Sequence, residues 1–156
     1  GMVARSKKDR TVEERKFGIQ IDSLCDAISF GVLPATLGLA VGASGIWYKI
    51  GAALFVLCGV IRLAYYNVTE EERQKGGEKR KYYLGMPITM SALLMPIVFC
   101  FCQLFSQGAA TIYTVALYVV AILFILPVSI PKPGIKGLSI LIGVGLLILV
   151  ALLLLK

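Results

Sequence analysis

The sequence contains no histidine among its 156 residues, which excludes histidine metal sites, catalytic triads and imidazole proton shuttles. Charged residues are also scarce, at 16%, whereas hydrophobic residues make up 58% and the mean hydropathy is +0.83. This balance argues against a water-soluble fold. The cysteines Cys25, Cys58, Cys100 and Cys102 lie in apolar segments and lack zinc spacing, so we expect small, reduced core residues.

Long apolar runs recur along the chain, at residues 17–41, 46–66, 83–105, 109–128 and 138–155. Each has about the 17–25 residues that a helix needs to cross a bilayer. The supply of glycine, proline and leucine, without an alternating polar period, favours helices over a membrane barrel. The sequence therefore predicts an all-α fold, a polytopic transmembrane bundle with about five spans in this chain.

Basic residues gather in alternate connections between these runs. Of the 16 lysines and arginines, six fall in residues 1–16 and five in residues 67–82, whereas residues 42–45 and 106–108 contain none. Since basic loops mark the cytosolic side, residues 1–16, 67–82 and 129–137 are expected to face the cytosol, the second as a solvated loop near anionic headgroups. This placement of the net charge of +7 indicates a membrane surface and not nucleic acid.

Two carboxylates interrupt the first apolar run. Gly18, Asp22 and Asp26 repeat every four residues, which places them on one face of a helix. A carboxylate near mid-helix costs roughly 2.5–3.5 kcal/mol on insertion scales, so the pair calls for a compensating cation or a function. Hard oxygen ligands suit magnesium, manganese or calcium, and Gly18 permits close approach to the backbone. The alternative is that both acids lie at the interface and snorkel.

Two cations also fall within apolar runs. Arg62 lies five residues before Asn67, in the cytosolic half of its run and at a depth comparable to that of the acids. Its planar guanidinium could bind a carboxylate or a phosphate in a polar cavity, or it could snorkel to headgroups. Lys49, near the opposite end, is expected to be an interfacial anchor.

These residues resemble a known signature. The stretch from Gly1 to Arg5, followed by Gly18, Asp22 and Asp26, is similar to D-x2-D-G-x2-A-R-x8-G-x3-D-x3-D of the CDP-alcohol phosphotransferase family. The match departs from the signature in two places: the leading aspartates would precede Gly1, and twelve residues separate Arg5 from Gly18 where the family has eight. A cytosolic loop absorbs such an insertion at little entropic cost.

Later stretches indicate an acceptor subclass. The run from Asp22 to Ala35, D-S-L-C-D-A-I-S-F-G-V-L-P-A, is similar to that of bacterial phosphatidylserine synthases. The stretches R-L-A-Y-Y-N-V from Arg62 and G-M-P-I from Gly85 resemble the same enzymes. The resemblance extends from residue 1 to about residue 100, and residues 106–156 are generic apolar helices within the same single domain.

The resemblance implies transfer of a phosphatidyl group from CDP-diacylglycerol to the hydroxyl of L-serine, with release of CMP, in a membrane enzyme that uses Mg²⁺ or Mn²⁺. It implies that Asp22 is a metal ligand and that Asp26 is the general base, or a second ligand. Within this reaction, Arg62 is the candidate for binding the acceptor carboxylate or a phosphate. The CDP-binding surface that it implies is formed by Gly1, Ala4, Arg5 and Gly18.

The resemblance also carries expectations about the rest of the protein. The missing aspartates and one or two further helices are expected upstream, so this chain alone is expected to be inactive. Family members are commonly dimeric, which implies a homodimer. Three alternatives stay open: another acceptor such as glycerol 3-phosphate, an ion-coupled transporter that uses the aspartates as a cation site, and a structural membrane subunit.

Overall fold

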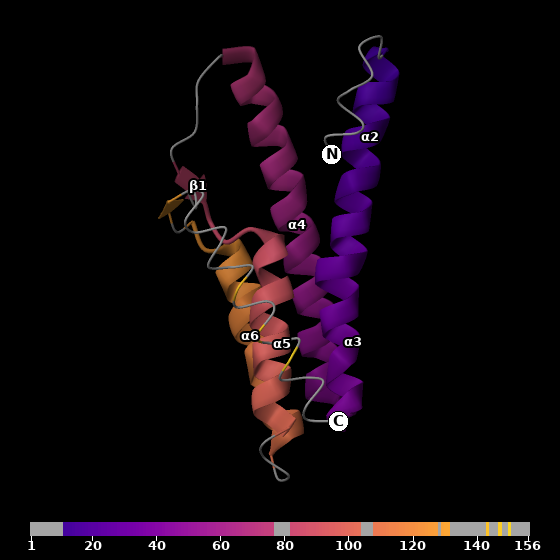
Figure 1. The fold of residues 1–156 in the computed structure, drawn as a ribbon, viewed down its shortest axis with the longest axis vertical. Coiled ribbons are helices and arrows are strands. Elements are labelled where there is room, and N and C mark those ends of the chain that lie inside the picture. The colour runs from indigo at the N-terminus through magenta and orange to yellow at the C-terminus, as the bar shows by residue number, and fades with distance from the viewer. Residues whose placement is uncertain are drawn as a thin grey trace.

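The computed structural model describes residues 11–76, 82–103, 108–127 and 129–131, together with the single positions 143, 147 and 150. Helices run side by side along the long axis of the molecule (Figure 1). The elements are α2 (Val12–Asp26), the π-helix η1 (Ala27–Val32), α3 (Leu33–Ala40), α4 (Ile46–Gly76), β1 (Tyr82–Leu84), the 3-10 helix η2 (Ile88–Met90), α5 (Ser91–Gln103), α6 (Ala109–Ile125) and β2 (Ser129–Pro131).

The start of α2 is fixed by local chemistry. The Thr11 hydroxyl accepts from the backbone N–H of Glu14, and the Glu14 carboxylate accepts from the backbone N–H of Thr11, each at 3.1 Å. This reciprocal capping box satisfies N–H groups that have no partner within the helix. The helix therefore begins at Val12, five residues before the apolar run at Phe17.

The first helix passes without a break from α2 through η1 into α3, and Pro34 accounts for the π-helical segment. Proline has no N–H to donate to the Phe30 carbonyl one turn earlier. The hydroxyl of Ser91 in α5 donates to that carbonyl instead, at 2.6 Å, and the Leu33 N–H reaches back five residues to the Ile28 carbonyl. A side chain distant in sequence thus stabilises the irregular turn.

Two tyrosines donate to further carbonyls of the same helix. The Tyr113 hydroxyl in α6 donates to the Pro34 carbonyl at 2.6 Å, and the Tyr48 hydroxyl in α4 donates to the Ala35 carbonyl. Apolar surroundings offer few other partners for such groups. Hydroxyls from several helices therefore hold the lower half of the first helix in place.

The core lies between α4, α5 and α6. Phe55, Met95, Leu117 and Phe124 are almost entirely buried. The Phe55 and Phe124 rings meet at a centroid distance of 5.4 Å and an angle of 54°, a tilted contact of the kind that aromatic pairs favour. Helices α4 and α6 thereby form the most tightly joined pair of the fold.

Two helical runs are long and apolar enough to cross a membrane, Val12–Ala40 and Ile46–Thr69. Most of their surface is not buried within the protein, so they do not resemble the core helices of a soluble domain. The shorter apolar helices are Ile88–Gln103 and Ala109–Ile125. Nearly all of the expected span 138–155 lies outside the described residues.

The charged stretch after the second run differs from the expectation of a loop. Helix α4 continues to Gly76, so residues 67–76 are helical. Their many Glu, Lys, Arg and Gln residues are good helix formers, and an existing helix extends more easily than a new one nucleates.

The helical fold that the sequence predicts is confirmed, and one short two-stranded ribbon is added to it. Strand β1 pairs antiparallel with β2, with Tyr83 opposite Ile130. The third apolar run therefore becomes helical only at Ile88, and not at residue 83. The reason is local, because Gly85 has a φ of +84° and Pro87 precedes the first helical turn.

The cysteines also differ in part from their expected positions. All four are free thiols. Cys102 is buried in the core, whereas Cys25 is exposed on α2. The interpretation as core residues is therefore correct for Cys102 and wrong for Cys25.

Candidate functional site

Gly18, Asp22 and Asp26 all lie on α2, and the helix confirms that they share one face. Asp22 is exposed, while Gly18 and Asp26 are half-buried. The two carboxylates are one turn apart and interact electrostatically. Two like charges at this spacing repel, so the face favours a bound cation.

The helix changes character directly after Asp26. The π-helical segment η1 begins at Ala27, and Ser91 supports it through the Phe30 carbonyl. Segments of π-helix are rare and occur frequently at functional sites. Here the segment alters the direction of the side chains beyond Asp26, so the carboxylate sits at the junction between an exposed helix and a packed one.

Helix α4 reaches the acid-bearing part of α2 through Asn67. The Asn67 amide donates from Nδ2 to the Ser23 hydroxyl at 2.7 Å, and that hydroxyl donates to the Ile19 carbonyl at 3.0 Å. The helices are antiparallel (Figure 1), and Arg62 precedes Asn67 by five residues, about 7.5 Å along the axis. Arg62 therefore lies at about the level of Ile28, just below Asp26.

Arg62 is a buried cation, with 8% of its surface exposed. Its Nε donates to the Met86 carbonyl and its Nη2 to the Gly85 carbonyl, each at 3.1 Å. The guanidinium also lies 5.7 Å from the ring centre of Tyr65, a cation–π contact. The cation thus supports the turn between β1 and η2, a contact that the sequence did not predict, and snorkelling is not its role in this arrangement.

Gly85 makes this contact possible. A Cβ at this position would lie 3.0 Å from the Leu126 carbonyl oxygen and 3.1 Å from Arg62 Cζ. Its φ of +84° is also one that other residues rarely adopt. A side chain would therefore displace both the turn and the guanidinium.

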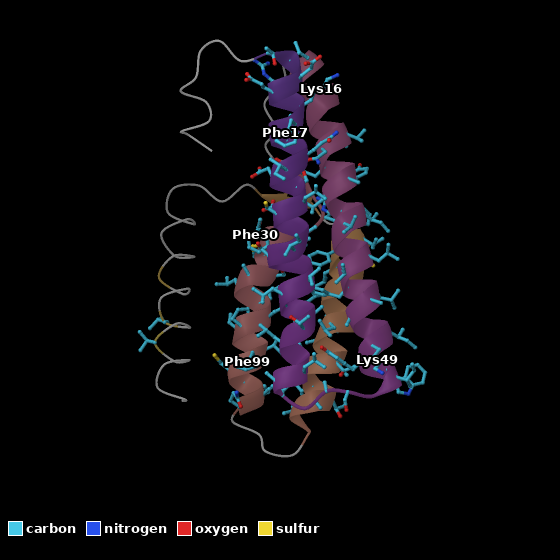
Figure 2. All side chains as sticks on the ribbon, turned by 90° about the vertical axis from the view of Figure 1, so that its right-hand side faces the viewer. Lys16, Phe17, Phe30, Lys49 and Phe99 are labelled. Atoms are coloured by element: carbon cyan, nitrogen blue, oxygen red, sulfur yellow. The ribbon has the colours of Figure 1, made fainter. Side chains whose placement is uncertain are left out.

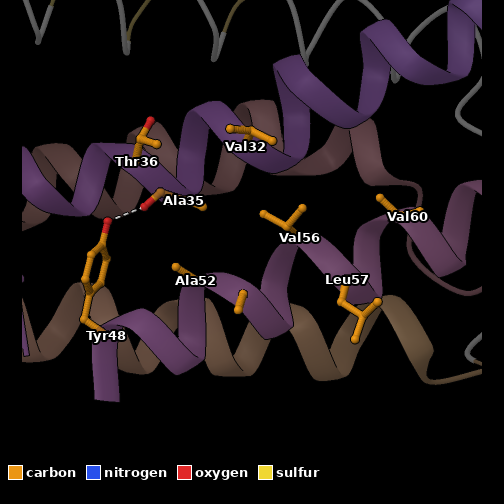
Figure 3. A pocket seen from close by; sticks show the side chains of 9 residues that line it. Val32, Ala35, Thr36, Tyr48, Ala52, Val56, Leu57 and Val60 are labelled. Carbon is orange, nitrogen blue, oxygen red and sulfur yellow. Dashed lines mark hydrogen bonds between the residues drawn. The ribbon is translucent and has the colours of Figure 1, made fainter. Parts of the chain in front are cut away.

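An open groove of about 540 Å³ lies between α3 and α4, and its walls are almost wholly apolar (Figure 3). Val32, Val56 and Val60 line its length, and the Tyr48–Ala35 hydrogen bond lies at one end. The groove begins at Val32, six residues after Asp26. An apolar surface thus continues from the polar site along the same two helices.

Lys16 and Lys49 lie toward opposite ends of the bundle (Figure 2). Lys16 and Phe17 lie at one end of α2, and Lys49 lies at the opposite end of α4, where its side chain is exposed (Figure 2). Phe30 lies between them on the first helix. Asp22 and Asp26 fall between Phe17 and Phe30 on the chain, and so lie between that end and the middle of the first helix.

The described part of the chain holds only part of the expected site. Within it, no three His, Cys, Asp or Glu side chains gather in a group that could hold a metal. The oxygen donors of Asp22 and Asp26 fit Mg²⁺ or Mn²⁺ chemically, as an incomplete ligand set. The nucleotide-binding candidates Gly1, Ala4 and Arg5 lie outside the described residues.

Sequence reasoning did not assign a role to Ser23 or Asn67. Both occur in the motifs quoted above, but they are 44 residues apart and their contact depends on how α2 and α4 pair. Asn67 follows a predominantly apolar run, and its polar side chain at that boundary was the available signal.

The chain belongs to the CDP-alcohol phosphatidyltransferase family, whose model matches residues 1–154. The motif-based prediction of this family is therefore confirmed.

Individual relatives carry more specific names. A CDP-diacylglycerol–serine O-phosphatidyltransferase of Saccharomyces cerevisiae is 37% identical over 64% of this chain and 36% of its own length. An enzyme of the same name from Methanocaldococcus jannaschii is 34% identical over 85% of this chain and 56% of its own. An archaetidylserine synthase of Methanothermobacter thermautotrophicus is 33% identical over 89% of this chain and 54% of its own length. The chain thus spans between about a third and just over half of these relatives.

Proposed function

We propose that this chain carries the reaction site of an enzyme that transfers a phosphatidyl group from CDP-diacylglycerol to the hydroxyl of L-serine, giving phosphatidylserine and CMP. The observation that carries the proposal is the single face of Gly18, Asp22 and Asp26 on α2, in a chain of this family. The names of the relatives support serine as the acceptor. Family membership favours this enzyme class over the transporter and the structural subunit.

In the proposed reaction Asp26 is the general base. Its carboxylate takes the proton of the serine hydroxyl, and the serine oxygen attacks the phosphorus that bears diacylglycerol. The bond from that phosphorus to the oxygen of CMP breaks, and CMP leaves with the electron pair. Proton transfer by a positioned carboxylate contributes about 10²–10⁴-fold to such a rate.

Asp22 is proposed to hold a divalent cation, Mg²⁺ or Mn²⁺, with Asp26 sharing the site in an alternative assignment. When bound, the cation would neutralise phosphate charge and polarise the reacting phosphoryl group. Gly18 leaves space for the nucleotide against the helix backbone, and Gly1, Ala4 and Arg5 are proposed to complete the CDP surface. Arg62 is proposed to meet the serine carboxylate or a phosphate, with its guanidinium held in place by the carbonyls of Gly85 and Met86.

The lipid part of the substrate is proposed to remain in the bilayer. The apolar groove between α3 and α4 starts just beyond Asp26 and would accept an acyl chain while the headgroup stays at the acids. We further propose a multi-pass cell-membrane protein with about five spans in this chain, the site facing the cytoplasm, surrounding membrane lipids as partners, and a homodimer.

The test measures CMP release from CDP-diacylglycerol in membranes that carry the complete reading frame. Serine, glycerol 3-phosphate and inositol are offered in turn, with Mg²⁺, with Mn²⁺ or with a chelator. We expect release with serine that requires the metal and is lost in Asp26→Asn. Release with another alcohol alone would replace the proposed acceptor and retain the chemistry, whereas no release with any alcohol would reject the proposal.

A further inference from the structure

Helix α2 carries the acids, yet apolar packing does little to hold it. None of its described residues, Val12–Asp26, is buried. Below it, η1 and α3 are tied to other helices by Ser91, Tyr113 and Tyr48. The position of Asp22 and Asp26 relative to α4 therefore depends on contacts that residues of α2 make with other helices.

Asn67 makes such a contact at the level of the acids. Its Nδ2 lies 2.7 Å from the hydroxyl of Ser23, the residue that follows Asp22 and precedes Asp26 by three. The contact joins residues 44 positions apart, and both side chains are half-buried. Partial burial reduces the competition from water that weakens an exposed hydrogen bond.

The direction of this hydrogen bond is determined by the chemistry. A hydroxyl has one hydrogen, and Ser23 directs it to the Ile19 carbonyl at 3.0 Å. The Ser23 oxygen can therefore only accept from α4, so the residue there must present an N–H or O–H. The Asn67 amide meets this requirement, which an apolar side chain of similar size would not.

We propose that the Asn67–Ser23 hydrogen bond is the positioning contact that sets α2 against α4 and so places Asp22 and Asp26 for the reaction. Neither residue touches the reacting atoms, and both act through the carboxylates on either side of Ser23. The expected loss of activity rests on the proposed function, whereas the expected change in the spacing of α2 and α4 rests on the geometry alone.

The kinetic test uses Asn67→Leu, Ser23→Ala, Ser23→Thr and the double variant Asn67→Leu/Ser23→Ala in the complete protein. We expect Asn67→Leu and Ser23→Ala each to lower kcat by about tenfold, while the KM for CDP-diacylglycerol stays within about twofold. Ser23→Thr keeps the hydroxyl and should retain activity. The double variant should be no worse than Asn67→Leu, because both changes remove the same contact.

The matched control is Thr69→Val, two residues further along α4. The Thr69 hydroxyl donates to the carbonyls of Tyr65 and Tyr66 in its own helix, so the variant removes a hydroxyl contact that does not cross between helices. We expect kcat within about twofold of wild type. Equal losses in Thr69→Val and Asn67→Leu, or losses that multiply in the double variant, would overturn the proposal.

A second measurement does not depend on activity. Spin labels are placed on Gln20→Cys in α2 and Val68→Cys in α4, both exposed, after the native cysteines, Cys25, Cys58, Cys100 and Cys102 among them, are replaced by alanine. The distance distribution should be narrow in this background and broaden in both Asn67→Leu and Ser23→Ala. Unchanged distributions would refute the positioning contact. Broadened distributions without CMP release from any alcohol would retain the contact and reject the proposed reaction.

Discussion

Helix α2 and the α4–α6 pair are built in opposite ways. Apolar side chains hold the pair together, with Phe55 and Phe124 buried against each other. In contrast, α2 has no buried residue among those described and meets α4 through the polar contact of Ser23 with Asn67. The helix that carries the candidate catalytic groups is thus separate from the packing that stabilises the fold.

This difference has a physical basis. Charged and nucleotide-binding groups need access to solvent and substrate, and burying an unpaired carboxylate would cost several kcal/mol. A site helix with exposed acids therefore relies on a rigid neighbour for its position. Changes to α2 should affect activity without affecting stability, and changes to the pair should do the reverse.

The largest expected effect is on catalysis. Asp26→Asn should lower CMP release by about 10²–10⁴-fold, because the amide cannot take the acceptor proton. Its thermal midpoint in detergent should match wild type, since Asp26 is only half-buried. Ser29→Ala, an exposed change three residues further along, is the control and should leave both quantities unchanged. A large loss of stability in Asp26→Asn would remove the separation between the two regions.

The second effect is on stability. Phe124→Ala should lower the free energy of unfolding by about 3–5 kcal/mol, because it removes a buried ring and leaves a cavity against Phe55. Ile125→Ala, at an exposed neighbouring position, should change it by no more than about 0.5 kcal/mol. Thermal unfolding monitored by circular dichroism measures both. Equal shifts in the two variants would contradict a core at this position.

A third change tests the turn that Arg62 supports beside the α4–α6 pair. Gly85→Ala places a side chain at a positive φ, which should destabilise the fold by about 1–2 kcal/mol. Its Cβ would also lie 3.0 Å from the Leu126 carbonyl oxygen. Gly42→Ala has a similar φ of +81° with no atom within 4 Å of the new Cβ, so it carries the strain alone. We expect the lower melting temperature in Gly85→Ala. If Gly42→Ala is equally destabilised, the close approach to Arg62 and Leu126 has no measurable effect.

The smallest effect concerns the hydroxyls that hold the first helix. Tyr113→Phe retains the buried ring but removes the hydroxyl that donates to the Pro34 carbonyl, and should destabilise the protein by about 0.5–1.5 kcal/mol. Tyr118→Phe removes an exposed hydrogen bond to the Trp47 carbonyl and should have less effect. Chemical denaturation of both variants gives the comparison, and the reverse order would show that burial does not decide the strength of these bonds.

The local sequence pattern was sufficient to predict part of the candidate site. The spacing of Gly18, Asp22 and Asp26 predicted a shared helix face, because the α-helical repeat alone determines it. The family followed from the same motif. The hydrogen-bond partners of Arg62 could not be predicted from the sequence, because they are main-chain carbonyls, which every residue type carries.

Composition and short periodicity are enough to predict the helical character, the two runs long enough to cross a membrane and the acid-bearing face. Three contacts instead depend on the packing of the helices: Ser91 supports the turn at Phe30, Arg62 holds the Gly85 turn, and Asn67 meets Ser23. Each of these contacts joins residues at least 23 positions apart. Their geometry depends on how whole helices pack, and no local propensity encodes that arrangement.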